Sequence, residues 1–163
     1  SFYAPSKTFN LAGLSTSFLI IPNKELKLRF DKTLDHLHLG MGNIFGAEAL
    51  KAAYNEGEDW LEELKSYLND NYRFLIAYLK ENIPEIKVTP TEATYLIWLD
   101  FRSFGMDDKQ LKEFIIREAG LGLNDGPSFG SGGSGFQRIN IAAPRAILEE
   151  GLQQLNKAIR KIR

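Results

Sequence analysis

The sequence predicts an α+β fold, in which a small and mostly antiparallel sheet is covered by helices. Two observations support this fold class. Segments with strand and helix patterns follow one another in the order strand, helices, strand, helix, two strands, helix. The chain has 163 residues, of which 44% are hydrophobic, so it is long enough for one domain with a substantial core.

The first half of the chain is expected to be mainly helical. Residues 14–21 are apolar or β-branched toward their end, which predicts a strand that stops before Pro22. Apolar residues at helical spacing then predict a helix over 24–38. A longer helical pattern covers 47–82, where Gly57 is a candidate interruption because glycine disfavours helix interiors by about 1 kcal/mol.

The second half is expected to supply the sheet and two covering helices. Four short segments combine apolar, β-branched and aromatic residues with flanking turn signals, which predicts strands. These segments are residues 86–89, 94–101, 121–124 and 136–142. Asp107 and Asp108 are candidate N-caps of a helix over 107–119, and a last helix is expected over 145–162, where apolar residues share one face.

Composition excludes several classes of partner. Twenty Lys and Arg residues balance 21 Asp and Glu residues, which leaves no electrostatic footprint for nucleic acid or an anionic membrane. No apolar run approaches the roughly 20 residues that span a bilayer, and no signal peptide is recognisable. The chain contains no cysteine, so a disulfide or a thiolate metal site is excluded. We therefore expect no nucleic-acid partner, no membrane partner and a cytoplasmic location.

Two patterns resemble binding motifs but have simpler interpretations. The stretch 130–135 fits the letters of a dinucleotide-binding loop, which requires a helix directly after its glycines. The residues that follow it are strand-like, so a hairpin connection is the better interpretation. His36 and His38 lie two residues apart on a predicted helix and point to different faces, so we expect no metal site.

Two cationic residues stand at positions suited to chemistry. Lys7 lies in a predicted turn between Ser6 and Thr8, and lysine amines can form Schiff bases with aldehydes. Arg145 follows Pro144 at a strand–helix junction, where a guanidinium can grip a carboxylate through two hydrogen bonds. Taken alone, a surface role for Lys7 and a structural salt bridge for Arg145 are the simpler interpretations.

Seven motifs in chain order favour chemical roles for Lys7 and Arg145 over these simpler interpretations. They are SKTFNLAGL (6–14), GNIFG (42–46), AYNEGEDWL (53–61), TYLIWLD (94–100), LNDG (123–126), GFQRINIA (135–142) and PR (144–145). Together they resemble the MalY/PatB-type cystathionine β-lyases, which belong to the class I/II aminotransferase superfamily of fold type I pyridoxal-phosphate enzymes. The resemblance runs over nearly the whole chain.

The resemblance implies a cofactor, a reaction and three site residues. Lys7 would hold pyridoxal 5′-phosphate as a Schiff base and would then exchange the Cα proton of an amino-acid substrate. Ser6 would help to bind the cofactor phosphate, and Arg145 would hold the substrate α-carboxylate. The implied reaction is β-elimination from a substrate such as cystathionine, which gives pyruvate, ammonia and a thiol.

The resemblance also implies an organisation into parts. Residues 1–46 would form the end of the large cofactor-binding domain, 47–82 a long interdomain helix, and 83–163 the C-terminal small domain. The upstream residues of the family's active site, including the aspartate that pairs with the pyridine nitrogen, are not in this sequence. A homodimer is expected for the full-length family.

Two alternatives to the lyase remain open. A class I/II aminotransferase uses the same lysine and the same first steps, so these residues do not separate the two reactions. An engineered or excised folded domain without catalytic activity is the other alternative. It is suggested by the missing upstream part, the absence of cysteine and the Gly-Ser connection. Family members usually carry an acidic residue and a cysteine where this chain has Ser134 and Ala143.

Overall fold

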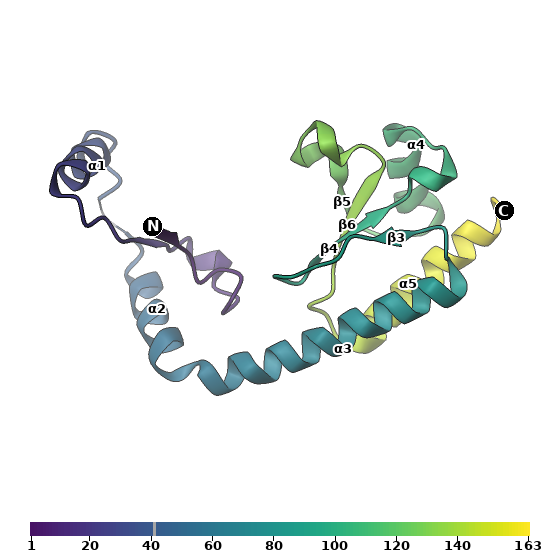
Figure 1. Cartoon of the computed structure of the whole chain (residues 1–163), viewed down its shortest axis with the longest axis horizontal. Helices are drawn as coiled ribbons and strands as arrows, with labels where there is room; N and C mark the ends of the chain where they lie inside the picture. The colour runs from purple at the N-terminus through teal and green to yellow at the C-terminus, as the bar shows by residue number, and fades with distance from the viewer. Residues whose placement is uncertain (41) are drawn as a thin grey trace. The chain divides into compact units, whose positions relative to one another are not determined.

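The computed structural model describes residues 1–40 and 42–163 of the chain (Figure 1). These residues gather into two compact units, Ser1–Leu64 and Lys65–Arg163. The boundary between the units falls inside the segment 47–82 that we expect to link two domains. The finer limits at 46 and 82 stay a prediction.

The first unit contains a short hairpin where the sequence suggested a longer strand. β1 (Phe2–Tyr3) pairs antiparallel with β2 (Phe18–Leu19). The prediction of a strand over 14–21 is therefore wrong for most of its length. Ser15 has a φ of 49°, in the left-handed region, and it caps a 3₁₀ turn over Ala12–Leu14, so only the later residues of the segment are extended.

Two helices follow, and an asparagine caps each of them. α1 (Lys24–His36) confirms the helix predicted over 24–38, and α2 (Ile44–Glu56) comes next. The side chains of Asn23 and Asn43 accept hydrogen bonds from backbone N–H groups three residues further on. These bonds satisfy donors that the first helical turn leaves unpaired, which explains where both helices begin.

The long helix predicted over 47–82 is divided at Gly57, the candidate interruption. α2 ends there and α3 (Glu58–Asn82) begins directly after it. A β-carbon on Gly57 would lie 2.5 Å from the carbonyl oxygen of Ala53 and 3.0 Å from Cε1 of Phe9. Because only glycine tolerates this close approach, the break is a packing requirement as well as a weakness in helix propensity.

The second unit holds a four-stranded antiparallel sheet with the strand order β3-β4-β6-β5. Its strands are β3 (Lys87–Val88), β4 (Leu96–Asp100), β5 (Asn124–Asp125) and β6 (Phe136–Asn140). All four predicted segments contribute a strand, and each strand is shorter than the segment predicted for it. The fold class is therefore confirmed as α+β with a small antiparallel sheet.

Helices supply the rest of the second unit. α4 (Asp108–Glu113) begins at a capping box in which Asp107 and Gln110 satisfy each other's backbone N–H groups, and it continues into a π-helical turn over Phe114–Glu118. α5 (Arg145–Arg160) completes the unit and confirms the last predicted helix. In the described part of the chain, no helix is both long and apolar enough to cross a membrane.

The hydrophobic core lies on one face of this sheet. Ile97 and Leu99 of β4 are at most 1% exposed, and they pack with buried residues of α3, α4 and α5. The alternate residues of β4 belong to the opposite face, since successive strand residues point to opposite sides. On that face Trp98 of β4 lies opposite Arg138 of β6. The sheet therefore has one core face and one face that carries aromatic and charged side chains.

Asn156 of α5 is a polar residue within the core side of its helix. Its side-chain oxygen is buried and has no hydrogen-bond partner among the described residues. Because an unsatisfied buried polar atom costs about 1–3 kcal/mol, Asn156→Leu is expected to raise the free energy of unfolding by about 1 kcal/mol in urea denaturation. Gln153→Leu, on the exposed face of α5, is the matched control and should change it by less than about 0.5 kcal/mol. Destabilisation by Asn156→Leu would show that the amide has a partner.

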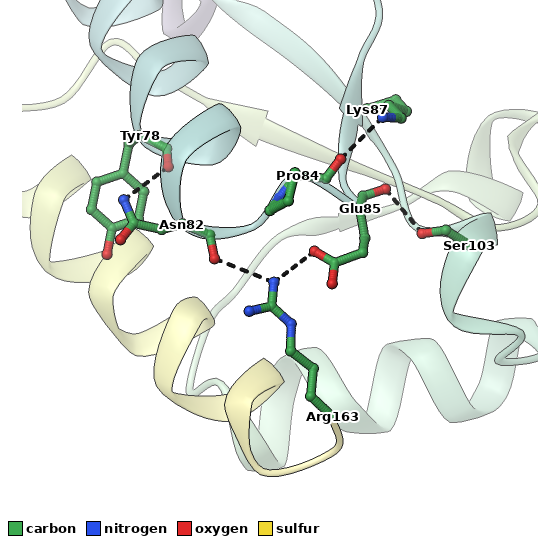
Figure 2. Close-up of polar contacts among 7 residues, drawn as sticks. All are labelled: Tyr78, Asn82, Pro84, Glu85, Lys87, Ser103 and Arg163. Atoms are coloured by element: carbon green, nitrogen blue, oxygen red, sulfur yellow. Dashed lines mark hydrogen bonds and ion pairs between the residues drawn. The ribbon is translucent and has the colours of Figure 1, made fainter.

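Figure 2 shows how Arg163, which lies three residues beyond the end of α5, is tied to the loop that follows α3. Nη2 of Arg163 donates to the carbonyl oxygen of Asn82 at 3.2 Å and to Oε2 of Glu85 at 2.6 Å. The hydroxyl of Ser103 donates to the carbonyl oxygen of Glu85 at 2.9 Å. The ion pair thus links two segments that are distant in sequence.

This ion pair predicts a pH-dependent contribution to stability. The hydrogen bond from Arg163 lowers the pKa of Glu85 from its ordinary value of 4.5. The contribution is therefore present above that value and is lost as the pH falls through the lower pKa of the folded state. We expect the difference in Tm between the wild type and Glu85→Gln to be small near pH 7, because the side chains of Arg163 and Glu85 are both more than a third exposed. The difference should vanish in more acidic buffer, where Glu85 is protonated. A difference that stays constant from about pH 7 to about pH 3 would contradict this assignment.

Candidate functional site

Lys7 and Ser6 lie together in one tight turn of the first unit. The backbone N–H of Phe9 donates to the carbonyl oxygen of Pro5 at 2.9 Å and closes the turn around them. Pro5 is buried and Ser6 is half-buried, whereas Lys7 is exposed. The turn therefore holds Lys7 as an exposed residue of the unit, while the buried Pro5 anchors the turn.

Aromatic packing anchors this turn. The ring of Phe9 lies 5.4 Å from that of Tyr54 in α2 and 6.4 Å from that of Trp60 in α3. Tyr54 in turn meets Phe18 of β2 edge-on at 5.9 Å. Ring pairs at these separations are favourable beyond the area that they bury. The motifs at 6–14 and 53–61 are thus brought into contact, which explains why both carry aromatic residues.

Arg145 lies in the second unit, where neighbouring groups fix its position. Its Nε donates to Oδ1 of Asn71 at 2.8 Å, and its backbone N–H donates to the hydroxyl of Tyr67 at 2.9 Å. Its guanidinium carbon lies 4.4 Å from the ring centroid of Phe74, within the range of a cation–π contact. Among the described residues, no carboxylate pairs with this guanidinium. The structural salt bridge considered from the sequence is therefore absent from the described residues.

Asn71 is the centre of this arrangement, and the sequence analysis did not single it out. It is completely buried, and its Nδ2 donates to the carbonyl oxygens of Ile141 at 2.9 Å and Ala143 at 3.0 Å. Through these bonds it joins α3 to the segment between β6 and α5. A signal for it was present in the sequence, because Asn71 shares the buried helix stripe of Leu75 and Leu79 at a spacing of four residues.

Arg138 of β6 is a second arginine that the sequence analysis did not consider as a site. Its Nη2 donates to Oδ1 of Asn124 at 3.0 Å, and its guanidinium carbon lies 4.2 Å from the ring centroid of Phe129. Its Nε is buried without a hydrogen-bond partner among the described residues. Because a buried guanidinium N–H is costly to leave unpaired, this group is well suited to receive an anionic ligand.

The glycine-rich stretch 130–135 forms a hairpin connection, as predicted. Its short 3₁₀ turn over Ser131–Gly133 leads into strand β6 and not into a helix, so the dinucleotide-binding interpretation is excluded for this loop. A β-carbon on Gly126 would lie 2.0 Å from the carbonyl oxygen of Gly133, so the two backbones touch. Over residues 1–40 and 42–163, no group of three or more His, Asp or Glu side chains could hold a metal ion.

Comparison with known proteins agrees with the motifs. No protein-family model matches the chain. Cystathionine β-lyase PatB of Bacillus subtilis is 38% identical over 156 residues, which cover 96% of this chain and 40% of PatB. Protein MalY of Escherichia coli is 33% identical and matches 97% of this chain and 41% of its own length. The resemblance to the MalY/PatB type is confirmed.

The structural comparison extends this result. Cystalysin from Treponema denticola, whose crystal structure contains a pyridoxal 5′-phosphate cofactor, superposes with a TM-score of 0.94 at 40% identity, over 99% of this chain and 41% of cystalysin. An aspartate aminotransferase of Pyrococcus horikoshii is 28% identical over 162 residues. The chain spans about two fifths of the length of these relatives, and it has the fold of the C-terminal portion of fold type I enzymes.

Proposed function

We propose that this chain is the C-terminal part of a pyridoxal-phosphate-dependent C–S β-lyase of the cystathionine β-lyase type. The observation that carries the proposal is the 38% identity to PatB over 156 residues, which cover 96% of the chain. The reaction breaks the Cα–H and Cβ–S bonds of an amino-acid thioether. The thiolate leaves with the electron pair of the Cβ–S bond, and water then completes the conversion to pyruvate and ammonia.

The residues of the lysine turn fit the proposed cofactor. The turn carries the Lys7 amine, which can condense with an aldehyde, between the Ser6 and Thr8 hydroxyls, which can donate hydrogen bonds to a phosphate. When bound, pyridoxal phosphate supplies an electron sink for the bonding electrons of the substrate Cα–H bond. In the proposal, Lys7 holds the cofactor and then removes the proton from Cα as a general base, and Ser6 helps to hold the phosphate.

Two arginines are candidates for the substrate α-carboxylate. Arg145 is the residue that the family resemblance implies, but its Nε is already bound by Asn71. Arg138 has a buried Nε without a partner among the described residues, and it lies on the sheet face that carries aromatic side chains. The geometry therefore favours Arg138, and Arg145 stays as the alternative.

Matched glutamine substitutions separate the two arginines. Removing one partner of a charge-assisted carboxylate contact costs about 2–5 kcal/mol, so Arg138→Gln is expected to weaken substrate binding by at least about 30-fold. Arg145→Gln should mainly lower the Tm, because it disrupts the bond to Asn71. The measurement is the dissociation constant of L-cystathionine for the cofactor-loaded protein. If Arg145→Gln weakened the binding of L-cystathionine more than Arg138→Gln did, the substrate carboxylate would be assigned to Arg145.

The proposed function is tested first by cofactor binding and then by product analysis. Pyridoxal phosphate added to the protein should give the visible absorbance band of lysine-bound pyridoxal, and no such band would support a folded domain without catalysis. Pyruvate release from L-cystathionine without added 2-oxo acid would establish β-elimination. Release of amino product only with a 2-oxo acid would instead establish an aminotransferase, the alternative that the Pyrococcus horikoshii relative favours.

The proposal includes the partners that the family resemblance implies. The substrate is an amino acid, and the complete protein is expected to form a homodimer in the cytoplasm. Sedimentation of the complete protein measures its oligomeric state, and a dimer is the expected result. A monomer with full lyase activity would show that dimerisation is not required for the reaction.

A further inference from the structure

Arg138 has neighbours on both sides along the sheet. In the strand register it lies between Trp98 of β4 and Asn124 of β5. Oδ1 of Asn124 accepts a hydrogen bond from Nη2 of Arg138 at 3.0 Å. Phe129, from the connection between β5 and β6, places its ring centroid 4.2 Å from the guanidinium carbon. Two protein groups therefore hold the guanidinium, one through a hydrogen bond and one through a cation–π contact.

These two contacts leave the Nε of Arg138 unpaired. The atom is buried and has no hydrogen-bond partner in the described part of the chain. An arginine side chain has many rotamers, and an unpaired buried N–H group is costly, so a free side chain would rotate until water reached its Nε. The contacts with Asn124 and Phe129 therefore hold Nε in place for an oxygen atom that the described residues do not supply.

The ring of Phe129 is itself held in place, although the residue is 49% exposed. The ring meets that of Trp98 edge-on at 5.3 Å. Phe129 ends the 3₁₀ turn Gly126–Phe129, which has Pro127 near its start. The backbone N–H of Gly130 donates to the carbonyl oxygen of Pro127 at 3.1 Å and closes this turn. The aromatic support of Arg138 is therefore arranged before any ligand binds, which lowers the cost of binding.

The carboxylate of Asp108, at the start of α4, fastens the far end of the same connection. Its Oδ1 accepts a hydrogen bond from the backbone N–H of Gly135 at 2.8 Å, and the hydroxyl of Ser134 donates to its Oδ2 at 3.0 Å. Between these points the backbones of Gly126 and Gly133 touch. Both ends of the connection are thus fixed, which restricts the positions that Phe129 can adopt.

We propose that Asn124 and Phe129 are positioning residues, which hold Arg138 so that its Nε donates to the α-carboxylate of the substrate. This inference rests on the proposed function, in which Arg138 binds that carboxylate. Neither residue has to touch the substrate in this role. Their contribution is to order a side chain with many rotamers before the substrate arrives, which corresponds to roughly threefold to tenfold in affinity.

The test compares two ligands of the cofactor-loaded protein that differ only in the carboxylate. L-Alanine carries an amine and an α-carboxylate and has no leaving group on Cβ, whereas ethylamine is the same molecule without the carboxylate. Isothermal titration calorimetry gives the dissociation constant of each. We expect Phe129→Leu and Asn124→Ala each to weaken the binding of L-alanine by about threefold to tenfold and to change that of ethylamine by less than about twofold. A general disturbance of the fold would instead affect both ligands alike.

Two further variants separate positioning from general packing. Phe129→Tyr keeps an aromatic ring beside Arg138, so it should bind L-alanine within about twofold of the wild type. Phe104→Leu is the matched control, because it removes another partly buried ring of the same unit, one that pairs with Phe101 at 5.9 Å. It should leave the dissociation constants of both ligands unchanged.

A double-mutant cycle shows whether Phe129 acts through Arg138. In an Arg138→Gln background, Phe129→Leu should cause no further loss of affinity for L-alanine. An equal loss in both backgrounds would overturn the inference. So would a loss in Arg138→Gln with none in Phe129→Leu and Asn124→Ala, and the carboxylate assignment would then stand. If Arg138→Gln itself bound L-alanine as tightly as the wild type, the carboxylate assignment would fall, and the inference with it.

Discussion

Asn71→Ala is expected to lower the free energy of unfolding of the second unit by about 3 kcal/mol. The change removes the acceptor of Arg145 Nε and the donor to two backbone carbonyl oxygens, those of Ile141 and Ala143. Asn71 is completely buried, so water cannot replace these bonds without entering the core. Urea denaturation followed by circular dichroism gives the free energy directly.

Two further variants make this result specific to the hydrogen-bond network. Asp70→Ala changes the exposed neighbour on the same helix and should alter the free energy by less than about 0.5 kcal/mol. Asn71→Asp keeps an acceptor for Arg145 but loses both donors, so it should also destabilise the unit. If Asn71→Ala were as mild as Asp70→Ala, the network would not be what joins α3 to the segment before α5.

Lys7→Ala is expected to abolish the visible absorbance band that pyridoxal phosphate gives with the protein. The band requires a lysine amine joined to the cofactor aldehyde, and the proposal assigns that amine to Lys7. The turn itself should persist, because its closing bond joins the backbones of Phe9 and Pro5 and its anchor is the ring of Phe9. The expected effect is therefore complete loss of the band with little change in Tm.

Lys24→Ala is the matched control for this variant. Lys24 is an exposed lysine of the same unit, at the start of α1, and its removal should leave the band unchanged. Exposed lysines react weakly with aldehydes, so a band in Lys7→Ala that is much weaker than the wild-type band would be the nonspecific background. A full band in Lys7→Ala would contradict the assignment of Lys7.

Much of the fold could be predicted from the sequence, because the helix caps, the helix-breaking glycine and the strand patterns all indicate the elements that form. Asp107 supplies a cap, Gly57 breaks a helical pattern, and segments of alternating burial become the strands β4 and β6. The strand predicted over 14–21 fails because a left-handed residue, Ser15, and a 3₁₀ turn interrupt a run that is apolar in composition. The apolar composition of residues 14–21 indicates burial, but it does not reveal the turn that ends at Ser15.

The candidate site was less predictable, because its residues depend on contacts between distant segments. Lys7 and Ser6 are found through the motif that contains them. Asn71 and Arg138 are significant only once α3, β6 and the loop near Phe129 lie beside one another. The unpaired Nε of Arg138 is a property of three-dimensional burial, and no sequence pattern reports it.

The most direct test of the account is chemical trapping of the cofactor. Borohydride reduction of the protein with bound pyridoxal phosphate converts the lysine linkage to a stable secondary amine, and peptide mapping by mass spectrometry then locates it. The account predicts a single modified peptide that carries the pyridoxyl group on Lys7. Label distributed over exposed lysines such as Lys24, or no label at all, would contradict the claim that this chain carries the cofactor lysine.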